Sequence, residues 1–353
     1  MGRNKNLLRK TCKMNLKIED IDTRIWEDEL EGFVPADIHD AHTHVYRWTD
    51  SLAPEKEPAS WRSMYCNPEG KIEDLRAVDA ALMPGRKVVS RFITAIPFTQ
   101  CNFETSNTFI RQQVGDDPNS GAFALVSHKT TDEQLETIMM KEGFVGIKPY
   151  RFYSISGDPV NCRLEDYLPE RLIKVLNRTG GIVMLHIAKK QGIADPENIS
   201  DLERLTSLYP NVQWNLCHAA RSYLPYFLEK NADRLRAIPN LWSDISSVCD
   251  SDALTALLKI IGTDRVMYGS DDLLVSARRG KYLTFGYAWV ELNEENSPFH
   301  PDHCDPRMTY IRYESLRALK RAAGNLALSQ KQIQDLFLGN ARSLLSMVKN
   351  NNR

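Results

Sequence analysis

One segment of the sequence, written DAHTH in one-letter code, combines residue type and spacing in a way that predicts chemistry. Side chains alternate along a β-strand, so we expect Asp40, His42 and His44 to share one face. Their neighbours His39 and Thr43 should then take the other face. Two imidazoles two residues apart can bind one metal ion through their ring nitrogens. A catalytic ion keeps three or four protein ligands and one open position, so the remaining ligands must come from elsewhere in the chain.

Three further polar residues end apolar runs of the kind that form buried strands. His186 follows IVML, His218 follows VQWNLC and Asp271 follows VMYGS. Each of them alone is explained equally well by a hydrogen-bonded histidine or a helix-capping aspartate. Their joint occurrence with the HxH pair predicts a metal site, provided that the fold brings the ends of these runs to one rim.

The elements that must position these residues repeat along the chain. Short apolar runs bounded by turn residues are each followed by a longer amphipathic stretch, which indicates βα units. Their starts are roughly 33 residues apart, as a (β/α)8 barrel of about 250 residues requires. The eight runs are Ala36–His42, Lys87–Ile96, Gly121–Ser127, Phe144–Pro149, Gly181–His186, Val212–His218, Leu241–Ser246 and Arg265–Ser270. We therefore predict an α/β fold, a single TIM-barrel domain over residues 1–353 with its core at about 36–348.

Helices are expected between the runs and after the last one. The candidates are Asp132–Lys141, Leu168–Thr179, Asp201–Tyr209, Tyr223–Arg236, Asp252–Ile261, Tyr310–Ala323 and Ser329–Val348. Ser329 and Gln332 form a capping-box pattern at the start of the last helix, whose apolar stripe should dock on the barrel. Three segments fall outside the repeat: an N-terminal extension of about 30 residues and two long segments, Arg47–Gly70 and Arg278–Arg307. The long segments follow strands one and eight, where barrel enzymes carry active-site loops.

The sequence resembles the amidohydrolase superfamily, in particular the amidohydrolase-related branch that includes aminocarboxymuconate semialdehyde decarboxylase. The resemblance extends from DAHTH through LH, CH and YGSD to LFLGNARSLL near the C-terminus. It implies a (β/α)8 barrel with a divalent metal centre. It further implies that the ligands are His42, His44, His186 and Asp271, with Asp271 also the proton-transfer base. His218 would be a catalytic residue or an additional ligand.

The chemistry of these side chains agrees with the roles that the resemblance implies. A bound metal lowers the pKa of water toward about 7, and a carboxylate within hydrogen-bond reach takes the proton. Asp271 can do this and then return the proton to the leaving group. A neutral His218 would polarise the substrate carbonyl or orient the water, and the charge of the ion disfavours its protonated form.

Basic residues near the same strand ends predict the type of substrate. Lys148 closes the fourth run, where some superfamily members carry a carboxylated lysine that bridges two metals. We expect instead a plain ammonium that binds a substrate carboxylate or a neighbouring acid. Arg151, Arg221 and Arg278 lie in the adjoining segments, and their guanidinium groups match the geometry of a carboxylate. These four residues are the predicted substrate-binding set.

Several other polar residues carry weaker expectations. Residues 299–304 (FHPDHC) look like a small metal cluster but lack a second pair of ligands. His39 and His128 are expected to be packed or solvated histidines. Asp244 and Ser246 end the seventh run, so either residue reaches the site or caps a helix.

Composition excludes several classes of function. Net charge is -1 with 26% charged residues, so no general field attracts nucleic acid or an anionic membrane. The seven cysteines are scattered and odd in number, which is typical of reduced thiols in the cytosol. The sequence lacks a signal-peptide pattern and an apolar run long enough to span a membrane. We expect a cytoplasmic enzyme that acts on a small molecule, with self-association left open.

The sequence leaves three readings of the activity. The preferred one is hydrolysis of an amide, ester or lactone in a small carboxylated molecule, using one divalent ion, zinc or else manganese. The second is non-oxidative decarboxylation of an unsaturated or aromatic acid, which would use the same rim residues. The third is a barrel that binds metal or ligand without turnover, but such a module needs neither an open-sided ion nor a base.

Overall fold

The computed structural model describes residues 16–58, 67–115, 117–297 and 301–351. Within these ranges, one sheet has the strand order β2-β1-β3-β4-β5-β6-β7-β8-β9, and every pair is parallel except β1 with β2. The strands are β1 (Asp37–Arg47), β2 (Glu69–Gly70), β3 (Lys87–Ala95), β4 (Gly121–Val126), β5 (Gly146–Pro149), β6 (Gly181–Leu185), β7 (Val212–Leu216), β8 (Leu241–Asp244) and β9 (Val266–Met267). The expected parallel strands are therefore confirmed.

The sheet closes where the chain beyond β9 returns to β1. The backbone N–H of Ala41 donates to the carbonyl of Tyr268 at 2.9 Å, and that of Asp271 donates to the carbonyl of His42 at 2.8 Å. A single bridge joins Thr43 to Asp272. This seam is less regular than the five-residue ladder between β6 and β7, but it completes the barrel that the sequence predicts.

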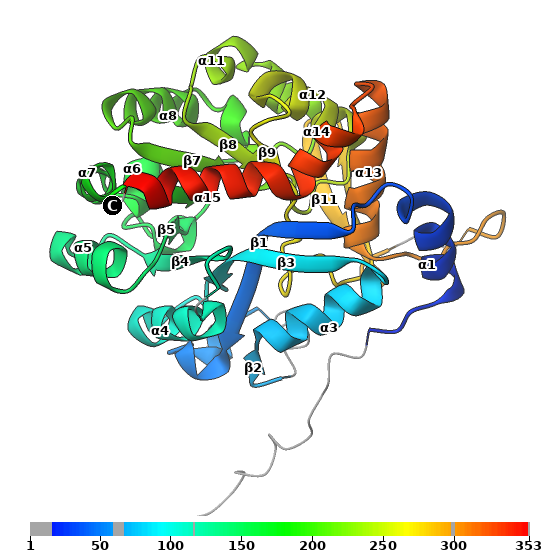
Figure 1. The fold of residues 1–353 in the computed structure, drawn as a ribbon, viewed down its shortest axis with the longest axis horizontal. Coiled ribbons are helices and arrows are strands. Elements are labelled where there is room, and N and C mark those ends of the chain that lie inside the picture. Colours follow the sequence, from blue (N-terminus) through cyan, green and yellow to red (C-terminus); the bar gives the residue numbers. More distant parts are fainter. Residues whose placement is uncertain (1–15, 59–66, 116, 298–300, 352–353) are drawn as a thin grey trace, which may run out of the picture.

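Helices surround the strands (Figure 1). Those between consecutive strands are α3 (Ile72–Leu82), α4 (Phe103–Val114), α5 (Asp132–Lys141), α6 (Leu164–Tyr167), α7 (Glu170–Thr179), α8 (Pro196–Leu208), α9 (His218–Arg221), α10 (Pro225–Glu229), α11 (Ala232–Arg236) and α12 (Ser251–Ile261). The flanking helices are α1 (Asp20–Arg24), α13 (Ile311–Asn325), α14 (Gln330–Gln334) and α15 (Asn340–Asn351). Short 3-10 or π turns are η1 (Ile25–Leu30), η2 (Trp48–Asp50), η3 (Pro54–Lys56), η4 (Arg151–Tyr153), η5 (Gly192–Ala194) and η6 (Asp335–Gly339).

Four expected elements differ from the structure. The predicted helix Asp201–Tyr209 begins earlier, at Pro196 of α8. The predicted helix Tyr223–Arg236 is two short helices, α10 and α11. The predicted helix Ser329–Val348 is interrupted by the π turn η6, although its capping box is confirmed. The segment Arg278–Arg307, expected as a loop, contains the hairpin β10 (Lys281–Phe285) and β11 (Ala288–Leu292). Gly286 supplies the positive φ of its two-residue turn, and this was the available sequence signal.

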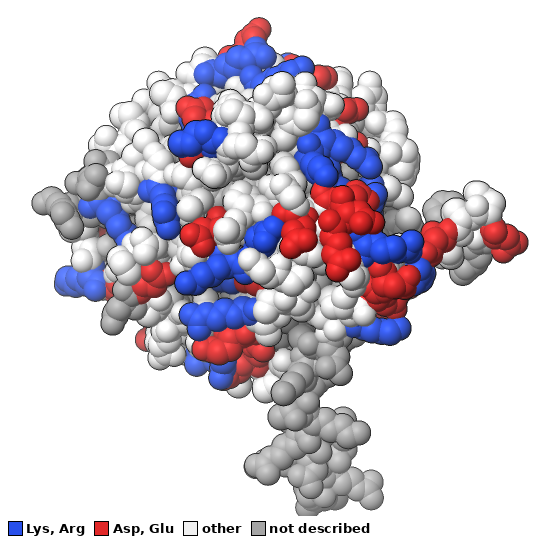
Figure 2. Space-filling model, turned by 45° about the vertical axis from the view of Figure 1, so that its right-hand side comes forward, with Lys and Arg blue, Asp and Glu red and all other residues white. Residues whose placement is uncertain are grey.

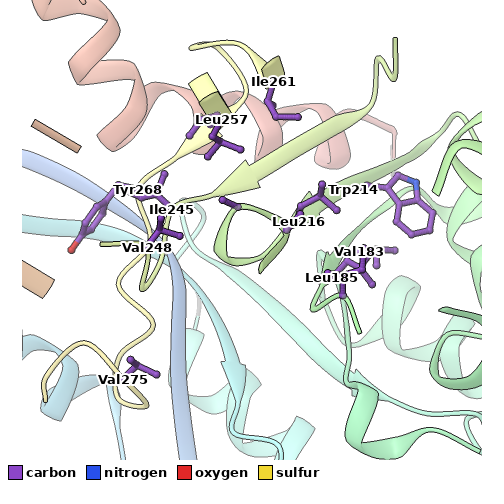
Figure 3. Packing of buried hydrophobic residues seen from close by; sticks show 14 of the residues in the cluster. Val183, Leu185, Trp214, Leu216, Ile245, Val248, Leu257, Ile261, Tyr268 and Val275 are labelled. Atoms are coloured by element: carbon purple, nitrogen blue, oxygen red, sulfur yellow. The ribbon is translucent and has the colours of Figure 1, made fainter. Parts of the chain in front are cut away.

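Two apolar layers hold the barrel together. The outer layer lies between strands and helices, and Figure 3 shows part of it, including Leu257 and Ile261 of α12 and, separately, side chains of β6 and β7. The inner layer fills one end of the barrel interior with side chains such as Phe92, Phe123 and Trp242. Helix α15 crosses this end (Figure 1) and adds Leu344, Leu345 and Val348 to the same layer. The predicted docking of the last helix is confirmed.

The charge distribution on the surface and the length of the helices agree with the expectations from composition. On the face drawn in Figure 2, basic and acidic side chains are interspersed rather than gathered by sign. In the described part of the chain, no helix combines the length and apolarity needed to cross a bilayer.

Candidate metal centre

Six side chains predicted from the sequence meet at the end of the barrel interior opposite α15. They line one cavity of about 270 Å³ and come from the carboxyl ends of five strands. Five of them are buried, and His186 is partly buried. The six residues are His42, His44, Lys148, His186, His218 and Asp271.

Asp271 lies at the centre of this group. Its Oδ1 is 3.0 Å from His44 Nε2 and 3.7 Å from His42 Nε2, and its Oδ2 is 4.0 Å from His218 Nδ1. Ser247 Oγ donates a hydrogen bond to Oδ2 at 3.0 Å. Ligand atoms of His42, His218 and Asp271 all lie within 4.8 Å of one another, a spacing that could hold one ion.

The hydrogen bonds of His44 give a direct test of whether a cation fits here. Its Nδ1 is 3.2 Å from the carbonyl of Ala95, which can only accept, so Nδ1 carries a hydrogen. In neutral His44, Nε2 is then a lone pair that faces the carboxylate of Asp271 at 3.0 Å. Two acceptors at this distance need a proton or a metal ion between them. In addition, buried His186 Nδ1 has no hydrogen-bond partner among the described residues. Both observations fit a metal ion.

Protonation states in the cavity also suit a metal. Burial lowers the pKa of His42 to about 4, helped by the charge of Lys148. Burial likewise lowers the pKa values of His186 and His218. Burial would raise the pKa of Asp271, but the neighbouring His218, together with His44 and His42, outweighs burial and holds that pKa well below its ordinary value. Neutral imidazoles and an ionised carboxylate are the forms that bind metals.

Asp244 supports the histidines from below the cavity. Its Oδ2 accepts from His42 Nδ1 at 3.2 Å, which turns His42 Nε2 toward the cavity, and its Oδ1 accepts from the backbone N–H of His218 at 3.1 Å. Ser246 Oγ lies 3.0 Å from His42 Nδ1 and 2.9 Å from His218 Nδ1. The sequence left open whether Asp244 and Ser246 reach the site or cap a helix. Because the cap of α12 is Asp250, and both residues contact the histidines, both reach the site. Such carboxylate–histidine contacts orient metal ligands.

The backbone around His218 is strained. His218, Ala219, Ala220 and Arg221 all have φ between 50° and 58°, so α9 is a left-handed turn. Residues with a Cβ pay roughly 1–2 kcal/mol each for this conformation. Strain of this kind persists where the surroundings fix it, often at functional sites. Here it directs His218 and Arg221 into one cavity.

Lys148 contacts an imidazole and a thiol rather than a neighbouring acid. Its Nζ donates to His42 Nε2 at 3.0 Å and to Cys217 Sγ at 3.1 Å, and the residue is fully buried. Neither contact is with an acid. Cys217 was not singled out from the sequence, although it directly precedes His218, and with His42 and Asp244 it forms a second group of clustered ligand atoms. Burial raises the pKa of its thiol.

The prediction that Asp40 shares one face of the strand with His42 and His44 is wrong. The β1–β3 pairing shifts register between Asp40 and Thr43, and an extra residue in a strand redirects the side chains beyond it. Asp40 Oδ1 accepts from the backbone N–H groups of His42 and Ser270, and its Oδ2 faces Arg91. His39 does not point away from the interior, because its ring packs edge-on against Phe92 at 4.5 Å.

The predicted arginines divide into two groups. Arg151 and Arg221 line the cavity, and the described residues offer neither of them an ion pair. Burial and the neighbouring Arg221 lower the pKa of Arg151 to about 10. Arg278 also lines the cavity but is 2.7 Å from Glu291.

The hairpin β10–β11 supplies an aromatic wall that the sequence did not reveal. Tyr282 stacks on Tyr223 with ring centres 4.9 Å apart, and Trp289 lies 4.4 Å from Tyr223. The guanidinium of Arg221 is 5.6 Å from the ring centre of Trp289. All four residues line the cavity. The sequence signal for this hairpin was the alternation of apolar and polar residues in KYLTF and AWVEL on either side of Gly286. Assigning the whole segment as a loop overlooks this pattern.

Two weaker candidates do not join the site in the part of the chain that the structure describes. Phe299 and His300 fall outside the described residues, and His303 and Cys304 are exposed and belong to neither cluster of ligand atoms found in the described chain. His128 is partly buried and its Nδ1 lies 3.2 Å from the carbonyl of Tyr153.

Comparisons with known proteins place this geometry in context. The model of the amidohydrolase family matches residues 39–347. A search of curated proteins finds no match. Among solved structures, an amidohydrolase from Burkholderia multivorans is 13% identical, with a TM-score of 0.57, over 88% of this chain and 99% of that one.

Two other solved structures show the same fold. A candidate 2-pyrone-4,6-dicarboxylic acid hydrolase from Pseudomonas putida is 17% identical, with a TM-score of 0.56, over 89% of this chain and 99% of that one. The 5-carboxyvanillate decarboxylase of Sphingomonas paucimobilis is 13% identical, with a TM-score of 0.53, over 88% and 99%. At these identities the likeness supports the barrel fold alone.

Proposed function

We propose that this chain, which belongs to the amidohydrolase family, is a metal-dependent hydrolase that cleaves an amide, ester or lactone bond in a small carboxylated substrate. The observation that carries the proposal is that His44 Nε2 faces the carboxylate of Asp271 at 3.0 Å while Nδ1 is turned to the carbonyl of Ala95, inside a cluster of buried histidines. We assign His42, His44, His186 and Asp271 as the ligands of one divalent ion. Nitrogen and oxygen donors of this kind suit zinc, with manganese as the second choice.

The proposed chemistry divides between the ion and the protein. When bound, the ion polarises the substrate carbonyl and makes water acidic enough to be deprotonated near neutral pH. Asp271 accepts the proton of the attacking water and later donates it to the leaving nitrogen or oxygen. Its position is fixed by Ser247 Oγ and by the backbone bond to the His42 carbonyl.

His218 is proposed to act next to Asp271. Its Nδ1 lies 3.1 Å from the carbonyl of Ser246, so Nδ1 carries the hydrogen and Nε2 carries the lone pair. A neutral imidazole of this tautomer accepts a hydrogen bond at Nε2, which suits it to orient the attacking water. The contact with Ser246 and the left-handed turn hold the ring in place.

The substrate carboxylate is proposed to bind Arg151 and Arg221. These two cations lie in a largely buried cavity without an acidic partner in the described chain, and a partly desolvated cation is stabilised by a partner of opposite charge. Arg278 already has Glu291, so its proposed contribution is to hold the hairpin against the cavity. Lys148 adds positive charge at the deep end of the same cavity.

Decarboxylation of an unsaturated or aromatic acid is the second candidate. The wall of Tyr223, Tyr282 and Trp289 provides flat apolar faces that suit a conjugated ring. One structure with this fold is named as a decarboxylase. Both reactions use the same rim residues, so the wall alone does not favour either one.

Product analysis distinguishes the two reactions. The zinc-loaded protein is screened against carboxylated lactones, amides and unsaturated acids in ¹⁸O-labelled water. Hydrolysis places one ¹⁸O atom in the new carboxylate and releases no CO₂. Release of CO₂ with a proton incorporated at carbon would support decarboxylation instead. Turnover that persists after chelation and removal of the metal would contradict both.

A further inference from the structure

A chain of five buried charged side chains lies between the barrel wall and the helices outside it. Asp40 belongs to β1, Arg91 to β3, Asp79 to α3 and Arg312 to α13, and Asp272 follows the proposed ligand Asp271. Figure 1 shows α3 and α13 beside β1 and β3. All five residues are at most 5% exposed.

Opposite charges alternate along this chain. Arg91 is 3.6 Å from Asp40 and also forms an ion pair with Asp79. Arg312 Nη1 donates to Asp79 Oδ1 at 2.8 Å, and its Nη2 forms an ion pair with Asp272. Asp79 is thus the central residue, and it binds one arginine on each side.

The two ends of the chain meet the two halves of the proposed metal site. Asp40 Oδ1 accepts from the backbone N–H of His42 at 3.2 Å and from that of Ser270 at 2.8 Å. At the other end, Asp272 Oδ1 accepts from Ser276 Oγ at 2.8 Å. The backbone carbonyl of Asp272 accepts from the N–H of His44.

The seam between β9 and β1 explains why such a chain is useful. The β1–β3, β4–β5 and β6–β7 ladders each pair four or more residues. At the seam, β9 has only two residues, and β1 is joined to the chain beyond β9 by the bridge Thr43–Asp272 and a few backbone hydrogen bonds. This seam determines how far the HxH pair lies from Asp271. Replacing buried ion pairs by apolar side chains of similar volume often leaves stability unchanged or improved, so stability alone is a weak reason to bury five charges.

We propose that Asp40, Arg91, Asp79, Arg312 and Asp272 are positioning residues that fix the distance between the His42–His44 pair and Asp271. They act through the backbone of β1 and of residues 268–276 rather than on the substrate. This role goes beyond the proposed function. It rests on the proposed function only for the part of the test that measures metal affinity.

The test uses Asp79→Asn, because Asp79 contacts neither a proposed ligand nor its backbone in any hydrogen bond of the described chain. Asp201→Asn is the matched control. Asp201 lies on α8, is buried, and forms an ion pair with Arg163 at 2.8 Å. Amide hydrogen exchange is measured on the metal-free proteins. Zinc affinity is then measured by chelator competition.

We expect Asp79→Asn to speed exchange in peptides covering residues 38–46 and 268–276, and to weaken zinc binding by about tenfold, the lower end for residues that support ligands indirectly. Asp201→Asn should change neither. Exchange in both segments equal to that of Asp201→Asn would overturn the proposal, whatever happens to zinc affinity. Absence of zinc binding by the wild type would instead contradict the proposed function, and the exchange comparison would still decide the role of the network.

A second variant covers failure of Asp79→Asn to fold. Arg312→Lys keeps the positive charge but loses the fork that reaches Asp79 and Asp272 together. The same two segments should exchange faster in Arg312→Lys, with a smaller loss of zinc affinity. Wild-type exchange in this folded variant would contradict the proposal.

Discussion

The two ends of the barrel interior are built from the same strands but from opposite kinds of side chain. Near α15 the interior is filled by apolar residues, among them Phe92, Phe123 and Trp242. At the other end the side chains are imidazoles, a carboxylate and an ammonium, and all of them except the partly buried His186 are buried as well. Burial therefore does not separate the two ends. They differ in that the apolar end is filled by packing, whereas at the polar end two acceptor atoms face each other and Arg151 and Arg221 have no acidic partner in the described chain.

The largest effect on the polar end is expected from Asp271→Asn. The amide keeps the shape of the side chain but is a poor base, so turnover should fall by roughly 10²- to 10⁴-fold. The apolar end and the fold should be unaffected, which thermal unfolding measures alongside kcat. Retention of wild-type kcat on a confirmed substrate would remove Asp271 from its proposed role.

Phe92→Ala is the corresponding change at the apolar end. Phe92 is fully buried between His39 and Phe123, and its truncation should cost about 3–5 kcal/mol of unfolding free energy. Denaturant titration measures the loss. The folded fraction should retain its metal content. If metal content per folded molecule fell together with stability, the two ends would not be independent.

Arg221→Met is expected to give a smaller effect, confined to substrate binding. The loss of a charged hydrogen-bond donor costs roughly 1.5–3 kcal/mol, which corresponds to about 10- to 150-fold in kcat/KM. We expect most of this in KM, because Arg221 binds a part of the substrate that does not react. Arg279→Met is the control, since Arg279 pairs with Asp22 away from the cavity. Equal KM changes in both variants would refute the carboxylate assignment.

Much of the fold could be predicted because each parallel strand is a short apolar run with visible ends. The meeting of His186, His218 and Asp271 at one rim follows from the barrel itself. The direction of Asp40 could not be predicted, because it depends on a register shift between β1 and β3. The contact between Lys148 and Cys217 joins residues 69 positions apart, and only tertiary packing brings them together.

The polar surroundings of the ligands were also beyond the reach of the sequence. The sequence could not decide whether Asp244 caps a helix or reaches the site, because both roles place an aspartate at the end of a strand. Only its distance to His42 distinguishes them. The aromatic wall forms where Tyr282 and Trp289 of the hairpin β10–β11 pack on Tyr223, and this tertiary contact has no local sequence pattern.

The central claim is that the polar end of the barrel holds a metal ion. Its most direct test is elemental analysis of protein purified without added metal or chelator, for the wild type and for the double variant His42→Ala/His44→Ala. We predict about one equivalent of a divalent transition metal in the wild type and none in the variant. A wild type that stays empty after incubation with zinc and with manganese, while correctly folded, would contradict the account.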